Sequence, residues 1–315
     1  MGATASLSPD DAREILTHFD LGQLVSLDEL TIQAHNAPYY RLTTTRGRFF
    51  LKRFLTFLPT TDRGLELILF LRDRGYPAIQ VHRSTHGGPR VRHGDHEIAL
   101  FEYLDLSDDR SVTRRRAAAL GDALGRLHTI ARDFPLPPTL VTHHYFTRRF
   151  EALPALEWMP AEAQDTLAWV THTFAGLDAP PDAPRGVCHV EFVMEHAAFF
   201  GDQLHRIFDW DLVGVGPLFH DLGTTLSQAV SPTHVDFGCL AAALRSYEAH
   251  RPLSPWEREH VCEATCFGIS KFLIWSMGRT MAGPSDLPHR GFAKVAVLRA
   301  LGKAGFDAAL AEALR

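Results

Sequence analysis

The sequence predicts an α+β protein of two lobes, with a small antiparallel sheet and one helix in the first lobe and mainly helices in the second. Two patterns point to this division. Short β-rich runs broken by turn residues fill the stretch from 29 to 55, whereas an amphipathic helix pattern begins near residue 113. The chain has 315 residues, enough for two cores if it divides near residue 100. We therefore predict lobes of residues 1–103 and 104–315.

The first lobe should open with three strands. The β-rich runs lie at 30–32, 39–43 and 49–52, and Thr45-Arg46-Gly47 forms a turn before the third run. A helix is expected over 64–74, because its apolar residues gather on one side before Gly75, and Thr61 or Asp62 can cap it. Beyond it, the pattern predicts strands at 79–82 and 97–101, separated by a turn segment at 87–95.

The second lobe should be helical except for one β-rich region. An amphipathic helix is expected over 113–131, and further helices over 238–315. Between them, short strands at 187–193 and 204–210 are joined by a turn that carries Gly201-Asp202. Polar side chains interrupt both apolar strands. Such groups are either satisfied structural residues or a site, and their number here favours a site.

Composition excludes several classes of protein. Hydrophobic residues make up 45% of the chain and charged residues 22%, as in globular proteins. The net charge of −5 gives no footprint for nucleic acid. The longest apolar runs, such as 65–71 and 272–275, are far shorter than the roughly 20 residues of a membrane helix. We expect neither nucleic acid nor a membrane as a partner.

The N-terminus and the cysteines point to a cytoplasmic protein. No charged-then-apolar signal peptide opens the chain, and the fit of Met1-Gly2 to a myristoylation pattern rests on small residues that match often by chance. The cysteines lack C-x-x-C spacing, so we expect neither a disulfide framework nor a zinc site. They are Cys188, Cys239, Cys262 and Cys266.

Lysine is rare in this chain, and Lys52 stands out for that reason. Of 32 basic residues only four are lysines, so arginine serves wherever a generic cation suffices. Lys52 ends a predicted strand, where a compact ammonium could reach phosphate oxygens from a rigid sheet. Glu66, on the following helix, is the natural partner for that ammonium. Each residue also has a purely structural interpretation. Lys52 would then be a surface lysine, and Glu66 a solvated carboxylate that the helix dipole favours in the first turn.

Two aspartates in the second lobe are candidate metal ligands. In Phe208-Asp209-Trp210-Asp211, both carboxylates would lie on one face of a strand and could bind a hard cation through oxygen. Asp221 begins the next predicted helix, where a capping, structural role is expected.

The order of these elements resembles the aminoglycoside phosphotransferase and homoserine kinase type II family. The resemblance covers nearly the whole chain and follows several motifs in sequence. They are Lys52, Glu66, a hinge at Phe101-Glu102-Tyr103-Leu104, the helix end Leu124-Gly125-Arg126-Leu127-His128, Phe208-Asp209-Trp210-Asp211, Gly214-Val215-Gly216-Pro217 and Asp221-Leu222. The stretch from Asn36 to Phe49 looks especially like the homoserine kinase branch.

The resemblance implies a protein-kinase-like fold and an ATP-dependent reaction. Residues 1–103 would form the nucleotide-binding lobe and 104–315 the catalytic and substrate lobe. Adenine would bind the hinge backbone at Glu102, Tyr103 and Leu104. The γ-phosphate would pass to a hydroxyl of a small molecule, such as an amino acid, an amino alcohol or an aminoglycoside-like compound.

The catalytic stretch departs from the family pattern of His-Gly-Asp followed by Asn. This chain reads His189-Val190-Glu191 and then His196. Glu191 stands at the base position and keeps a carboxylate, one methylene longer. His196 stands at the metal-binding position, where an imidazole nitrogen suits Mg²⁺ less well and Mn²⁺ or Zn²⁺ better. We expect ATP with Mg²⁺, or Mn²⁺ because of His196, with Asp209 and Asp211 as further metal ligands.

A second copy of the tripeptide occurs as His93-Gly94-Asp95, before the hinge, where we interpret it as a connection between strands.

Three functional hypotheses remain at this point. In the first, the chain is a small-molecule kinase with Glu191 as base. It could instead be a degraded relative that binds a nucleotide or metabolite without transfer. The third is a metal site of two histidines and one carboxylate, in which His189 and Glu191 share a strand face with His196 nearby. Acceptor contacts would come from helices around 141–175 and 235–285.

Overall fold

The computed structural model contains two packing units, described separately below. The N-terminal unit is Met1–Ser107 with Arg206–Asp211, and the C-terminal unit is Asp108–His205 with Leu212–Arg315. The residues described are 6–30, 39–106, 109–137, 164–165, 168–170, 180, 182–280 and 287–315, without the side chains of 274–280 and 287–289. These units are defined by packing alone. The predicted assignment of nucleotide binding to residues 1–103 and of catalysis and substrate binding to 104–315 therefore stays a prediction.

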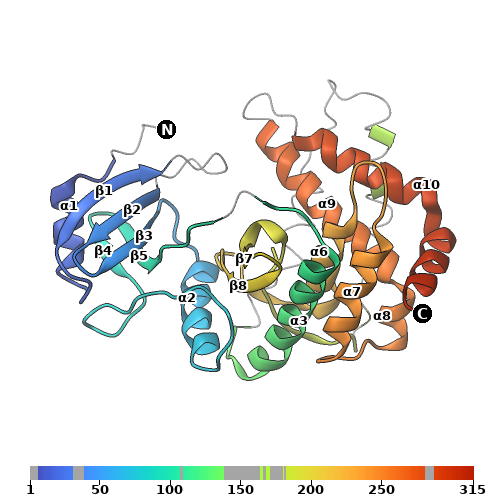
Figure 1. The fold of residues 1–315 in the computed structure, drawn as a ribbon, viewed down its shortest axis with the longest axis horizontal. Helices are drawn as coiled ribbons and strands as arrows, with labels where there is room; N and C mark the ends of the chain where they lie inside the picture. Colours follow the sequence, from blue (N-terminus) through green and yellow to red (C-terminus); the bar gives the residue numbers. More distant parts are fainter. Residues whose placement is uncertain are drawn as a thin grey trace. The chain divides into compact units, whose positions relative to one another are not determined.

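The N-terminal unit is built on a five-stranded sheet, drawn in blue to teal in Figure 1. Its strands follow the order β1-β2-β3-β5-β4, and every neighbouring pair is antiparallel. The elements are α1 (Pro9–Leu16), β1 (Leu24–Leu30), β2 (Tyr39–Thr44), β3 (Gly47–Phe54), α2 (Pro59–Arg72), β4 (Val91–His93) and β5 (His96–Glu102). Helix α1 packs its buried face against the apolar side of the sheet and closes a core with Tyr40, Leu51 and Ile98.

Several boundaries in this unit differ from the expected ones. The first strand is Leu24–Leu30 and precedes the predicted run at 30–32, of which residues 31 and 32 lie outside the described residues. Helix α2 starts at Pro59, because proline lacks an N–H and has a φ suited to the first helical position. Its N-cap residue, Leu58, makes no side-chain hydrogen bond. The expected caps, Thr61 and Asp62, therefore lie inside the helix.

The predicted strand at 79–82 is reduced to isolated bridges, from Ala78 to Ile207 and from Val81 to Phe101. The tripeptide His93-Gly94-Asp95 connects β4 and β5, as expected, and Gly94 takes a left-handed conformation there.

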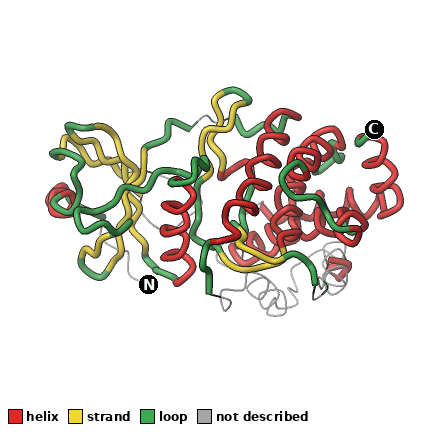
Figure 2. The backbone as a smooth tube through the Cα atoms, turned by 90° about the horizontal axis from the view of Figure 1, so that it is seen from below, coloured by secondary structure: helices red, strands yellow, loops and turns green. Residues whose placement is uncertain are grey.

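The C-terminal unit is mostly helical, as the red segments of Figure 2 show. Helix α3 (Arg114–Ile130) starts at an N-cap, Thr113, and closely matches the predicted helix. Further helices are α6 (Leu218–Leu226), α7 (Phe237–Glu248), α8 (Pro255–Glu259), α9 (Val261–Thr280) and α10 (Leu287–Ala313), the last interrupted at Gly302. Most of the predicted acceptor region at 141–175 lies outside the described residues, whereas 235–285 contains α7, α8 and α9.

The β-rich region of this unit pairs differently from the expected pattern. Strand β6 (Arg185–Cys188) pairs with β9 (Gly214–Pro217), and β7 (Ala197–Phe200) pairs with β8 (Gln203–Ile207). The turn at Gly201-Asp202 thus connects β7 to β8, where Gly201 has a positive φ. The predicted strand over 187–193 ends at Cys188, because Val190 turns the backbone into the left-handed region.

The segment Arg206–Asp211 packs with the N-terminal unit although it lies a hundred residues beyond β5. Ile207 accepts a hydrogen bond from the backbone N–H of Ile79 and donates one to the carbonyl of Pro77, each at 2.8 Å. Gly64 on α2 lets the segment approach closely, because a Cβ at that position would lie 1.9 Å from the carbonyl oxygen of Trp210. The close approach places two candidate metal ligands, Asp209 and Asp211, in the same unit as Lys52.

Substituting alanine for Gly64 should therefore cost stability. The added methyl group meets backbone, which cannot rotate away, so we expect the free energy of unfolding to fall by about 1–3 kcal/mol. Chemical denaturation measures this change. Gly305→Ala on α10 is the control, because its Cβ would meet only the side chain of Leu301, and it should leave the stability unchanged or raise it slightly. Equal effects of the two substitutions would contradict the role assigned to Gly64.

Candidate active site

Lys52 projects from β3 and forms ion pairs with two aspartates. Its Nζ lies 2.6 Å from Oδ2 of Asp211 and 3.6 Å from Oδ1 of Asp209. On the strand, Lys52 is paired with Tyr39 on one side and Ala99 on the other. The lysine side chain is only 15% exposed. The structure thus places one partly buried cation between two carboxylates on a rigid sheet.

The charge of Lys52 is stabilised by these carboxylates. Burial alone would lower the pKa of its ammonium, but Asp211 and Asp209 outweigh that effect and hold the pKa above its ordinary value. The side chain is consequently cationic throughout the neutral pH range. A cation of this kind is suited to phosphate oxygens.

The two aspartates reach Lys52 by a geometry other than the predicted one. Strand β8 ends at Ile207, and Asp209 has a φ of 63°, so alternation along a strand does not set their directions. Trp210 between them anchors the segment: it is buried, its indole N–H donates to the carbonyl of Ile207 at 3.0 Å, and its ring meets Tyr76 edge-on. The left-handed residue and the buried indole together present both carboxylates to one ammonium.

Glu66 does not pair with Lys52 in this structure. Its carboxylate forms an ion pair with Arg63, one turn earlier on α2. A helix position fixes which neighbours a side chain meets at the i,i+3 spacing, and here that neighbour is an arginine. A role for Glu66 in nucleotide binding stays a prediction.

The predicted hinge lies where β5 ends. The carboxylate of Glu102 accepts hydrogen bonds from the backbone N–H of Gln80 at 2.7 Å and from Arg206 at 2.6 Å. Tyr103 lies under the guanidinium of Arg48, and Leu104 is half-buried. The side chain of Glu102 therefore connects the predicted hinge to the segment Arg206–Asp211. Adenine recognition by the backbone of 102–104 stays a prediction.

In the C-terminal unit, Asp221 holds the backbone of the catalytic stretch. One of its carboxylate oxygens accepts from the backbone N–H of His189 and the other from that of Val190, each at 2.8 Å. His128 donates to the same carboxylate at 3.2 Å. The expected capping role is wrong, because α6 begins at Leu218 and its N-cap, Pro217, has no side-chain hydrogen bond. Asp221 instead fixes two successive peptide groups.

Asp221 and His128 are completely buried, and their charge states follow from burial and pairing. Burial favours a neutral carboxyl, but the hydrogen bond from His128 and the nearby positive charge of Lys271 keep the pKa of Asp221 below its usual value. Burial lowers the pKa of His128. A neutral His128 therefore donates to a charged Asp221.

The polar chain continues away from Asp221. Nδ1 of His128 lies 2.8 Å from the hydroxyl of Tyr247, which accepts in turn from Arg251. Arg251 pairs with the fully buried Glu257 at 2.7 Å. The side chains of this network, from Asp221 to Glu257, thus all have partners, which rigidifies the part of the structure that holds the catalytic stretch.

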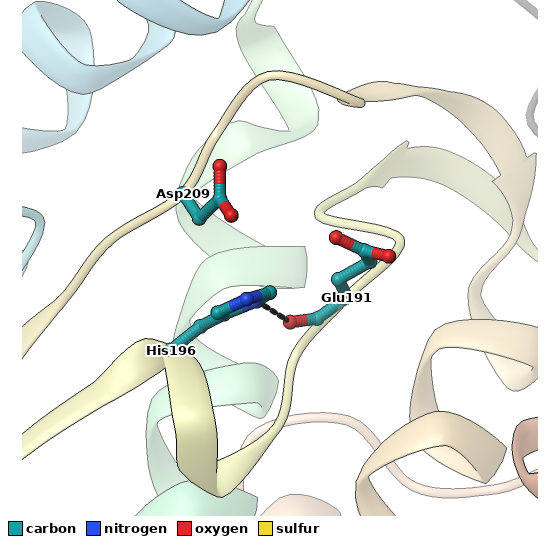
Figure 3. Close-up of side chains that lie close together, drawn as sticks. All are labelled: Glu191, His196 and Asp209. Atoms are coloured by element: carbon teal, nitrogen blue, oxygen red, sulfur yellow. Dashed lines mark hydrogen bonds between the residues drawn. The ribbon is translucent and has the colours of Figure 1, made fainter. Parts of the chain in front are cut away.

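His196 lies close to Glu191 in the same unit, as Figure 3 shows. Its Nδ1 lies 2.9 Å from the backbone carbonyl oxygen of Glu191. A carbonyl oxygen can only accept, so Nδ1 carries a proton, and Nε2 is the ring nitrogen that can bind a metal ion. Asp209, also drawn in Figure 3, belongs to the N-terminal unit.

The hypothesis of a metal site of two histidines and one carboxylate loses its geometric basis. It required His189 and Glu191 on one face of a strand, but the strand ends at Cys188 and Val190 has a φ of 76°. The ring of His189 has no exposed surface and packs edge-on against Phe192. His189 is therefore a buried core residue.

Two residues near Glu191 were missed by sequence reasoning. Lys271 on α9 is buried and donates to the carbonyl of Val190, which itself has an unusual backbone conformation. The scarcity of lysine, which singled out Lys52, applies equally to Lys271. No pattern in the sequence indicates that Lys271 and Val190 meet.

Two further observations concern the chain as a whole. All four cysteines are free and buried. Among the described residues, no helix combines the length and the apolar character that a membrane crossing requires.

A family model and the sequences of known proteins both relate this chain to phosphotransferases. The family model described as "Phosphotransferase enzyme family" matches residues 27–259. A homoserine kinase from Afipia carboxidovorans is 26% identical over 274 residues, covering 82% of this chain and 80% of that protein.

Solved structures of small-molecule kinases share the fold. An amicoumacin kinase in complex with AMP-PNP, Ca²⁺ and Ami superposes with a TM-score of 0.67 at 13% identity, covering 93% of this chain and 92% of that one. A microcompartment-associated aminopropanol kinase gives 0.66 at 16% identity, covering 98% and 99%. The predicted protein-kinase-like α+β fold is confirmed. Because the family model spans most of the chain, this protein belongs to the phosphotransferase enzyme family.

Proposed function

We propose that this protein transfers the γ-phosphate of ATP to a hydroxyl of a small molecule. The observation that carries the proposal is the ion-paired Lys52, a partly buried cation held by Asp209 and Asp211 on a rigid sheet. Phosphoryl transfer needs a cation on the phosphates and acidic groups for a divalent ion, and this arrangement supplies both kinds of group. Membership of the phosphotransferase family supports the same chemistry.

The donor atoms fit a divalent metal ion. Asp209 and Asp211 offer carboxylate oxygens, which Mg²⁺ prefers, and His196 offers the lone pair on Nε2, which suits Mn²⁺ better. We propose these three residues as metal ligands. When bound, the ion would neutralise charge on the β- and γ-phosphates. Lys52 would bind phosphate oxygens in place of part of its present pairing with the aspartates.

Glu191 is the proposed general base. Its carboxylate would accept the proton of the acceptor hydroxyl as the hydroxyl oxygen attacks the γ-phosphorus. Asp221 holds the peptide groups that precede His189 and Val190, so the chain enters Glu191 from an ordered stretch of backbone. Such ordering matters because a displacement of about 1 Å can cost roughly a hundredfold in rate.

The acceptor class is proposed from the relatives. Homoserine and aminopropanol, named for two relatives, are small molecules with both a hydroxyl and an amine. We propose an acceptor of this kind, an amino acid or amino alcohol with a free hydroxyl.

A second candidate is nucleotide binding without transfer. The observation that favours it is the catalytic stretch, where Glu191 follows a β-branched residue at positive φ and His196 takes the metal position. Under this alternative Lys52, Asp209 and Asp211 still bind nucleotide.

Turnover should be detected with amino alcohols and hydroxylated amino acids as acceptors. Purified protein with ATP and either Mg²⁺ or Mn²⁺ should consume ATP and form a phosphorylated product in proportion to the acceptor added. Coupled ADP release and mass spectrometry of the product measure both. Nucleotide binding with no product across the panel would establish the second candidate, and failure to bind nucleotide with either ion would reject both.

Replacing Lys52 should abolish most activity. In Lys52→Met the phosphates lose their cation and two carboxylates lose their partner, so we expect kcat/KM to fall by roughly a hundred- to a thousandfold. Steady-state kinetics measures this change. Lys303→Met is the matched control, because that lysine is exposed on α10, and it should stay within about twofold. Similar kinetics for the two variants would refute the role of Lys52.

Replacing His196 should change the preference for metal. Asn offers an oxygen, so His196→Asn should raise the ratio of activity with Mg²⁺ to activity with Mn²⁺ by roughly tenfold or more. Parallel assays with each ion at saturation give the ratio. His250→Asn, which removes an imidazole paired with Asp122 elsewhere in the unit, should leave it unchanged. An unaltered ratio in His196→Asn would remove this residue from the proposed ligands.

A further inference from the structure

Lys271 lies directly beneath the catalytic stretch. It comes from the middle of α9, and only 2% of its surface is exposed. Its ammonium donates to the backbone carbonyl of Val190 and, at 3.0 Å, to the hydroxyl of Thr224 on α6. Val190 immediately precedes Glu191. A buried cation therefore contacts the peptide group that leads into the proposed base.

Val190 has a backbone conformation that its side chain disfavours. Its φ is 76°, in the left-handed region, where a β-branched residue is a genuine outlier and glycine is the usual occupant. Such a residue stays in this region only if the surrounding structure holds it there. Its side chain packs with Cys188 and Leu218, and the contacts of its two peptide groups supply a further, directional constraint.

Those contacts fix the peptide planes on both sides of Val190. Asp221 accepts from its N–H, which sets the plane of the peptide group before the residue, and also from the N–H of His189. Lys271 donates to its carbonyl, which sets the plane of the peptide group after it. The dihedrals of a residue are the rotations between these two planes. Asp221 and Lys271 together thus define the conformation of Val190 and the direction in which Glu191 leaves it.

Electrostatics agrees with this arrangement. Burial lowers the pKa of Lys271 to about 8, and the negative charges of Glu191 and Asp221 act in the opposite direction. An ammonium in such a buried place is costly unless its donors are used, and the Val190 carbonyl and the Thr224 hydroxyl use two of them.

We propose that Lys271 is a positioning residue which, opposite Asp221, holds Val190 in the left-handed conformation and so directs Glu191. This inference rests on the proposed function where it names Glu191 as the base. Lys271 itself would act only through the backbone of Val190.

A double-mutant cycle of Lys271→Met and Val190→Gly tests the proposal. Methionine keeps the length of the side chain without its charge, and glycine accepts a positive φ without strain. With valine at 190, we expect Lys271→Met to lower kcat by about a hundredfold, as a displaced base would. With glycine at 190, the same substitution should lower kcat by less than about tenfold, because the backbone no longer leaves the left-handed region. Lys271→Met removes the hydrogen-bond donor to the carbonyl of residue 190 in both backgrounds. The cost of that loss therefore cancels when the two changes in kcat are compared.

Two measurements separate positioning from general damage. The KM for ATP should change less than about twofold in Lys271→Met, because Lys52, Asp209 and Asp211 belong to the other unit. If Lys271→Met fails to fold, Lys271→Gln replaces it in the cycle; because glutamine keeps a donor, we expect a smaller loss of kcat with valine at 190 and a still smaller one with glycine. Lys303→Met serves as the charge control, with no dependence on residue 190. An equal loss of kcat in the two backgrounds would overturn the proposal.

The cycle remains informative if the proposed function fails. For a wild-type protein without turnover, the coupling is read from denaturant unfolding and from amide exchange of His189 and Val190. Lys271→Met should then accelerate exchange of these amides with valine at 190 and much less with glycine. The same acceleration in both backgrounds would reject the inference about Lys271, whereas absent turnover alone would reject only the role of Glu191.

Discussion

The return of Arg206–Asp211 to the N-terminal unit is the constraint on which the candidate nucleotide site depends. This segment bonds through Ile207 to the backbone of Pro77 and Ile79, and it approaches α2 so closely that only glycine fits at position 64. The buried indole of Trp210 then locks its register. Without this return, Lys52 on β3 would lose the counter-charges of Asp209 and Asp211, and burial would disfavour its ammonium.

The two units hold their polar side chains in place by different kinds of contact. In the N-terminal unit, Lys52 and two partly exposed aspartates form an ion pair that incoming phosphates and metal can rearrange. In the C-terminal unit, Asp221 is fully buried and binds the backbone N–H groups of His189 and Val190. A buried and fully satisfied carboxylate is costly to disturb, so this part of the structure stays rigid. Exchange of partners is thus confined to the groups proposed to meet ATP.

A largely buried lysine occurs in each unit, with different partners. Lys52 and Lys271 are both largely buried in a chain that otherwise relies on arginine. A compact ammonium can enter a narrow space and donate in three directions, which a planar guanidinium cannot do. Lys52 uses that property towards carboxylates, and Lys271 uses it towards a carbonyl and a hydroxyl.

The sequence by itself determined the fold class, a helix over 113–131 that is observed at 114–130, and the connection at His93-Gly94-Asp95, because these follow from local periodicity, turn chemistry and composition. Composition also singled out Lys52 as a candidate site residue. Tertiary structure alone decided the partners. Lys52 pairs with Asp209 and Asp211, 157 and 159 residues away, rather than with Glu66, which meets Arg63 on its own helix. Likewise, positive φ at Val190 and Asp209 ends the strands that alternation predicted. These outcomes depend on contacts between distant segments, and no local pattern encodes which distant groups will share a buried space.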